Sequence, residues 1–156
     1  MRFPNIVRDY CQWAEGEPAD ALAEARTARK LLAELYRRAI DLRDFAVGDG
    51  EPEAPEIPLN DYLRVRARFA ALPVSHYSTC FNPFAVPPEP PVRANLPGDL
   101  ADIWRDLKGG LALFEADAVA AAMWEWQFRF ESHWAHHACA AIYALQVWLS
   151  EHDVKS

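Results

Sequence analysis

Residues 118–149 place the strongest constraint on how this chain folds, because they suit one long helix that is apolar on most sides. On a helical wheel at about 100° per residue, apolar side chains cover two adjoining faces of this region. These side chains are Met123, Trp124, Trp126, Phe128, Phe130, Trp134, Ala135, Ala141, Ile142, Leu145, Trp148 and Leu149. A helix with this pattern is usually buried between neighbours, so we expect it to be the central helix of a bundle.

Three further helices are expected in the first half of the chain. Apolar spacing and end signals predict a short helix over residues 6–15, which Gly16 ends, and a long helix over residues 18–45. A loop rich in Gly, Pro and Glu follows, and then a helix over residues 60–72.

Residues 74–86 have no helical period and contain bulky and β-branched side chains, so we expect an extended segment packed on the helices. Within it, Asn82-Pro83-Phe84 is typical of a turn. The Pro-rich run at residues 87–91 is typical of polyproline II. A ligand for a proline-binding domain is one interpretation of this run, and a rigid crossover between two helical halves is the favoured one.

A second strong helix precedes the last one and forms an antiparallel hairpin with it. Asp99 is its expected N-cap, and the turn is expected near Ala116 and Asp117. The pair Gly109-Gly110 costs about 1 kcal/mol per residue relative to alanine, and a bulky indole near Trp124 would explain it.

The fold class predicted from these patterns is all-α. We expect one domain over residues 1–156, a compact bundle of about five helices. Its parts are N-terminal helices (1–72), an extended and Pro-rich crossover (73–97) and a C-terminal antiparallel helical hairpin (98–150).

Charge and composition argue against some classes of partner. The 23 acidic and 16 basic residues give a net charge of −7, which does not suit nucleic acid or an anionic membrane. The 3 cysteines form no C-x-x-C pair and fit a reducing compartment. Apolar runs are too short to span a membrane. We therefore expect a soluble, cytoplasmic protein without nucleic-acid or membrane partners.

One narrow polar stripe interrupts the apolar surface of the last helix. The candidate site residues are Glu125, Arg129, His133, His136 and His137, faced across the hairpin by Asp102 and Asp106. Glu125 and Arg129 have the i,i+4 spacing of an ion pair. His133 and His137 have the same spacing, which would aim both imidazoles at one point.

Two interpretations of this stripe stay open. In the first, the two aspartates with His133 and His137 line a pocket and bind a divalent metal, or a histidine beside Glu125 acts as a general base. In the second, which we favour, the stripe is a buried hydrogen-bond network that fixes which helix faces meet. We therefore assign no catalytic residue, cofactor or bound metal from the sequence.

Two stretches resemble the DUF5063 family of bacterial proteins of unknown function. They are Asp99-Leu-Ala-Asp-Ile-Trp-Arg-Asp-Leu-Lys-Gly-Gly-Leu and Met123-Trp-Glu-Trp-Gln-Phe-Arg-Phe-Glu-Ser-His-Trp-Ala-His-His-Ala. Asn82-Pro83-Phe84 also looks like the D-P-F stretch of that family, with asparagine in place of the acid. The resemblance covers most of the chain and is densest from residue 77 onward. It implies a compact helical fold and assigns no activity or catalytic residue.

The favoured functional hypothesis is a non-enzymatic interaction or accessory protein. Its long second helix and tryptophan-rich flank would bind a protein partner or a second copy of the chain. The alternative is a small-ligand or metal-binding protein that uses the polar stripe, and the sequence leaves open whether such a protein is an enzyme.

Overall fold

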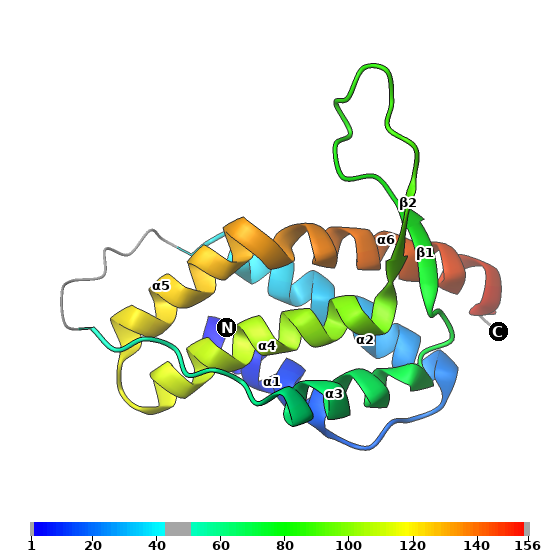
Figure 1. The fold of residues 1–156 in the computed structure, drawn as a ribbon. Coiled ribbons are helices and arrows are strands. Elements are labelled where there is room, and N and C mark those ends of the chain that lie inside the picture. The colour runs from blue at the N-terminus through cyan, green and yellow to red at the C-terminus, as the bar shows by residue number, and fades with distance from the viewer. Residues whose placement is uncertain (1, 43–50, 155–156) are drawn as a thin grey trace.

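Helices packed in a bundle make up most of the protein, and one small hairpin projects from it (Figure 1). The computed structural model describes residues 2–42 and 51–154. The first half contains α1 (Phe3–Glu15), α2 (Ala21–Ala39), α3 (Leu59–Arg68) and a 3-10 turn, η1 (Phe69–Ala71). Strands β1 (His76–Thr79) and β2 (Val92–Asn95) lead to α4 (Leu96–Glu115). The chain then forms α5 (Val119–Arg129), a π-helical turn η2 (Phe130–Trp134) and α6 (Ala135–His152), which together are the last helical run.

Capping side chains set two helix starts that differ from the prediction. The Asp20 side chain accepts a hydrogen bond from the Ala23 N–H at 2.9 Å, so α2 begins after Asp20 and not at residue 18. It ends at Ala39, and the last part of the predicted helix, residues 43–45, lies outside the described residues. The Asn95 side chain accepts from the Gly98 N–H at 2.7 Å. Asn95 is therefore the N-cap of α4, and the prediction that Asp99 caps this helix was wrong.

The most enclosed helix is α4, and not the last helical run as predicted. α4 packs against α1, α3, α5 and α6, and most of its side chains are buried. The last run instead leaves one apolar flank in solvent, where Trp124 and Phe128 are 36% and 41% exposed. An apolar circumference predicts burial, but it does not decide which of several apolar helices has neighbours on all sides. Among the described residues, no helix is long and apolar enough to span a membrane.

Trp126 fixes how closely α4 and α5 approach. Its indole lies against Gly110, where a methyl group would overlap the ring, and its Nε1 donates to the Leu107 carbonyl at 2.9 Å. The expected contact between a bulky indole and the glycine pair is therefore present, although Trp126 makes it in place of Trp124. The turn at Ala116 and Asp117, where φ of Asp117 is 64°, connects the two helices as predicted.

The expected extended segment is part of an antiparallel hairpin. β1 and β2 pair from His76↔Asn95 to Thr79↔Val92, and the loop between them projects away from the helices (Figure 1). The Pro-rich run lies in this loop. The predicted turn is present, since the Asn82 side chain accepts from the Phe84 N–H at 3.0 Å. The hairpin thus connects α3 with α4 and stands beside the first turn of α4.

Candidate metal centre

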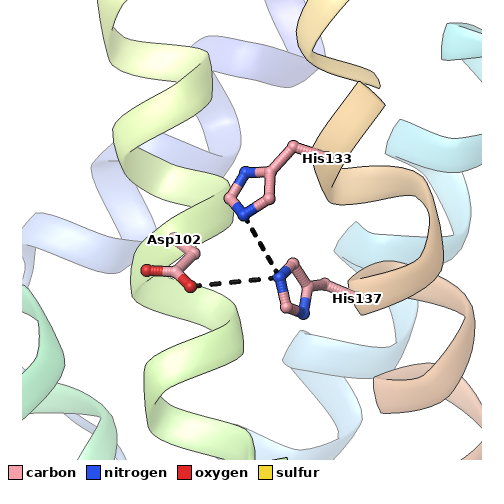
Figure 2. A group of neighbouring side chains, drawn as sticks. All are labelled: Asp102, His133 and His137. Carbon is pink, nitrogen blue, oxygen red and sulfur yellow. Dashed lines mark hydrogen bonds and ion pairs between the residues drawn. The ribbon is translucent and has the colours of Figure 1, made fainter. Parts of the chain in front are cut away.

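Two rows of polar side chains face each other where α4 packs against the last helical run. α4 contributes Asp99, Asp102 and Asp106, and the last run contributes His133 and His137. These spacings of three and four residues return to the same face of a helix. Figure 2 shows the side chains of Asp102, His133 and His137 pointing toward one another from the two helices.

A π-helical turn sets the direction of the two histidines. His133 lies within η2, and His137 follows one turn later in α6. A π turn contains more residues than an α turn, so it rotates the helix after it relative to the helix before it. An α-helical wheel over the whole run therefore places His136 in the stripe and leaves His133 and His137 at its edge. The structure brings the latter two to the centre and leaves His136 exposed beside them.

His133 is held by a carboxylate on α4. Its Nδ1 lies 2.5 Å from Oδ2 of Asp106, whose side chain is only 6% exposed. Burial raises the pKa of Asp106, and the hydrogen bond with His133 acts in the opposite direction. A carboxylate in this position keeps a proton on Nδ1 of the imidazole. The Nε2 atom of His133 is then the atom with a free electron pair.

His137 is held in the same way by a second carboxylate. Its Nδ1 lies 3.1 Å from Oδ1 of Asp99. This hydrogen bond is the main reason that the pKa of His137 is raised, with burial acting against it. The other oxygen of Asp99 accepts a hydrogen bond from the Tyr77 hydroxyl of β1. In neutral His137, Nε2 is again the atom that is free to accept.

The two Nε2 atoms face each other and a third donor atom. They are 3.3 Å apart, and Nε2 of His137 lies 3.9 Å from Oδ2 of Asp102. The three ligand atoms all lie within 4.8 Å of one another. Tetrahedral zinc, with bonds of about 2.0–2.1 Å, needs ligand atoms about 3.3 Å apart. The pair of imidazoles already has this spacing, whereas Oδ2 of Asp102 lies farther away, 3.9 Å from Nε2 of His137.

The third side chain of the cluster is oriented as well. Oδ1 of Asp102 accepts from the Tyr62 hydroxyl at 2.7 Å and from the Arg105 guanidinium at 3.2 Å. The same guanidinium lies over the Tyr62 ring, 4.6 Å from its centroid. These contacts turn Oδ2 toward the histidines. Asp102, His133 and His137 thus each have one polar atom held by a neighbour and one directed at a common point, and we refer to these three residues as the candidate metal centre.

The remaining predicted residues lie outside this cluster. Glu125 and Arg129 form the expected ion pair at 2.8 Å, further along the last helical run. The His136 ring packs on the His137 ring with centroids 4.3 Å apart, and burial, with the charge of His137, lowers the pKa of His136. Neither arrangement directs an atom at the candidate metal centre.

Sequence reasoning missed Asp99, Tyr62 and Tyr77 as parts of this site. Asp99 could have been found, because it precedes Asp102 by three residues and Asp106 by seven on one helix face. It was instead assigned to a cap. The two tyrosines belong to α3 and β1. No local pattern in the sequence predicts how these two elements pack against α4.

Comparisons with known proteins establish a family and a fold but no activity. The model of DUF5063, a domain of unknown function, matches residues 1–151. The crystal structure of protein BF1032 from Bacteroides fragilis is similar, with a TM-score of 0.77 and 21% identity. That match covers 99% of this chain and 93% of the other, and at this identity it shows the fold alone. No curated protein matches the chain.

Proposed function

The chain belongs to the DUF5063 family, whose function is unknown, and we propose that it binds a divalent transition-metal ion through Asp102, His133 and His137. One observation carries the proposal. The Nε2 atoms of the two histidines face each other at 3.3 Å while both Nδ1 atoms are engaged by carboxylates. Two free electron pairs at this distance repel each other unless a cation or a proton lies between them.

The charge around the site also favours a cation. Asp99, Asp102 and Asp106 place three carboxylates along one side, and the Arg105 guanidinium pairs with Asp102. A divalent ion would offset the excess negative charge. A proton shared by the imidazoles would offset only part of it, and this is the buried-network interpretation that the sequence favoured.

The donor set indicates which metals fit. Two imidazole nitrogens and one carboxylate oxygen suit zinc, iron, cobalt or nickel, whereas calcium and magnesium prefer oxygen ligands alone. Hydrogen bonds from carboxylates to the far nitrogen of each ligating imidazole are the usual outer support of such sites. Three protein ligands leave a coordination position for water or another ligand. The side chains of His133 and Asp102 are 34% and 23% exposed, so this position has access to solvent.

The test is a metal titration of the chelator-treated protein, followed by calorimetry and elemental analysis. We expect the wild type to bind one zinc ion per chain, and His133→Ala or His137→Ala to abolish stoichiometric binding. Asp106→Asn should weaken affinity about 10–100-fold, as loss of an outer partner does. His136→Ala is the matched control, because its imidazole lies one residue away and should be dispensable. Absence of binding in the wild type, or equal loss in all variants, would contradict the proposal.

A second candidate function is self-association through the exposed flank of α5. The rings of Trp124 and Phe128 stack with centroids 5.0 Å apart and are 36% and 41% exposed, and Val119 on the same helix is 46% exposed. This flank supports the interaction hypothesis, with a second copy of the chain as the partner. Light scattering after gel filtration should show a dimer that Trp124→Gln converts to a monomer. A wild type that is monomeric at high concentration would rule this out.

A further inference from the structure

A phenol of the hairpin is connected to the candidate metal centre by two consecutive hydrogen bonds. Tyr77 lies within β1, opposite Ala94 of β2. Its hydroxyl donates to Asp99, and the other oxygen of Asp99 lies 3.1 Å from Nδ1 of His137. Burial, followed by the bond to Asp99, raises the pKa of Tyr77, so the phenol keeps its proton and remains a donor. The position of β1 therefore bears on the orientation of a metal ligand.

A second contact joins the hairpin to the same histidine. The Phe81 ring, just beyond β1, meets the His136 ring edge-on with centroids 5.9 Å apart. The His136 ring in turn packs on His137 at 4.3 Å. The hydrogen-bonded path and the ring path start from different residues of the hairpin and both end at His137.

A metal ion on Nε2 would strengthen this connection. It would draw electron density from the imidazole, which makes the Nδ1–H a better donor to Asp99 and holds that carboxylate in one orientation. The second oxygen of Asp99 is then positioned to accept from the Tyr77 hydroxyl. The effect must operate in both directions, since a coupling free energy between two equilibria is reciprocal.

We propose that metal binding and docking of the β1–β2 hairpin are thermodynamically linked through Tyr77, Asp99 and His137. Tyr77 is a positioning residue for the candidate metal centre, and this inference rests on the proposed function. The linked element ends in an apolar loop, where Phe84 and Val86 are 88% and 94% exposed. Metal occupancy is thereby transmitted to the part of the molecule that projects from the bundle (Figure 1).

Other contacts could hold the hairpin regardless of metal, so the experiment must separate the two cases. Cys80 of the hairpin and Trp148 of α6 line a groove of about 750 Å³, so the hairpin lies beside that helix. The Leu96 N–H also donates to the Ser75 carbonyl at 2.8 Å at the base of the hairpin. If these contacts suffice, metal leaves hairpin opening unchanged.

The experiment measures hydrogen exchange of the amides of residues 76–79 and 92–95, with and without zinc, alongside zinc affinity. In the wild type, we expect zinc to slow exchange at these amides by about 5-fold or more, as is typical of coupled sites. In Tyr77→Phe, the slowing by zinc should be smaller than in the wild type, because only the ring contacts of Phe81 and His136 remain, and zinc affinity should fall by the same factor. Asp99→Asn interrupts the middle of the hydrogen-bonded path and should reduce the slowing in the same way. Tyr143→Phe is the matched control, since its phenol is 72% exposed and lies on α6.

Each outcome decides something. Equal slowing by zinc in the wild type and Tyr77→Phe, or an unchanged zinc affinity in Tyr77→Phe, overturns the linkage while leaving the candidate metal centre intact. A wild type that binds no zinc overturns both proposals. Agreement between the change in affinity and the change in exchange supports the linkage, because a loss of general structure would not make these two factors equal.

Discussion

At the scale of single residues, Gly110 is the position where the packing leaves no room for a side chain. Glycine is less favourable than alanine inside a helix. It is needed here because the indole of Trp126 occupies the space that a methyl group would need. The indole also donates its N–H to the Leu107 carbonyl. Any added atom at residue 110 must therefore displace a buried ring that is hydrogen-bonded.

We predict that Gly110→Ala lowers the free energy of unfolding by about 1–3 kcal/mol, the usual cost of overpacking. Urea denaturation measures the change. Gly109→Ala is the control, because a methyl group there would meet the Ala54 methyl at 3.3 Å and the Pro55 carbonyl oxygen at 3.9 Å, and its effect should be much smaller. Similar losses for the two variants would mean that flexibility of the backbone, and not the indole, explains the glycines.

A second prediction at this scale concerns the pH dependence of the metal-free protein. The hydrogen bond to Asp99 raises the pKa of His137 above its unfolded value, which is about 6.5. Charged His137 therefore stabilises the fold fully below that pH, and the contribution is lost as pH rises through the folded pKa. The raised pKa of Asp106 acts in the same direction, but in the more acidic range between its own unfolded and folded values.

Urea denaturation in the presence of a chelator, measured across pH 5–9, should show that the stability of the wild type declines as pH rises. The decline should be weaker in His137→Gln. Zinc affinity should change in the opposite direction, because protons and metal compete for Nε2. If stability depends on pH in the same way in His137→Gln and in the wild type, the decline is not due to His137.

A feature of the site can be predicted from the sequence when the residues that form it lie close together on one helix. The Glu125–Arg129 pair and the convergence of His133 and His137 follow from spacing on one helix, and both were predicted. The role of Asp99 was within reach of the same argument. Tyr62 and Tyr77 were not, because their contacts depend on how α3 and β1 pack on α4.

At the scale of elements, η2 explains why the helical wheel was only partly right. The boundaries of the last run and its turn at residue 116 follow from local patterns. A π turn leaves no comparable signal, since it depends on which packing arrangement of Phe130 and Trp134 the neighbouring helices accept. Its effect is seen at the histidines, since His133 and His137 point toward α4 while His136, which the wheel placed in the stripe, is exposed.

One buried carboxylate joins α1, α2 and α3. Glu24 is 1% exposed and accepts from the indole N–H of Trp13 at 2.7 Å and from the Ala19 N–H at 2.6 Å. The Arg68 guanidinium of α3 completes its surroundings at 2.9 Å. Because the charge of Glu24 is taken out of water, its arginine partner carries much of the stability at this junction.

We predict that Arg68→Met destabilises the protein by about 3–5 kcal/mol, since it leaves an uncompensated buried charge. Arg37→Met should change stability by less than about 0.5 kcal/mol, because exposed pairs contribute little. Arg37 pairs with Asp41 on the surface, where the two side chains are 64% and 66% exposed. Chemical denaturation of the two variants side by side provides the comparison, and equal effects would contradict the argument.

At the scale of the whole molecule, metal binding should appear as thermal stability. Zinc at about 100 times its dissociation constant adds about 2.7 kcal/mol to a protein that binds it only when folded. For a chain of this size the gain corresponds to a rise of about 5–10 °C in Tm. Asp102→Asn should lose most of the rise, whereas Asp117→Asn, in the exposed α4–α5 turn, should keep it. A similar rise in both variants would indicate binding elsewhere.

The architecture as a whole was within reach of the sequence, because apolar periodicity alone predicts helices that must pack on one another. Which helix is central could not be predicted from the sequence. It depends on the sum of contacts between elements distant in the chain, and α4 gains neighbours from both halves of the chain while α5 keeps an exposed flank.

The seam between α4 and the last helical run also bears on how such a protein can change over evolutionary time. The donor atoms and their carboxylate partners all come from one continuous stretch, residues 99–137, and in the described part of the chain the phenols of Tyr62 and Tyr77 are contributed from elsewhere. Metal chemistry could thus be acquired, tuned or abandoned by substitutions within a quarter of the chain. Helices α1 and α2 contribute none of these contacts among the described residues, so they would diverge as scaffold.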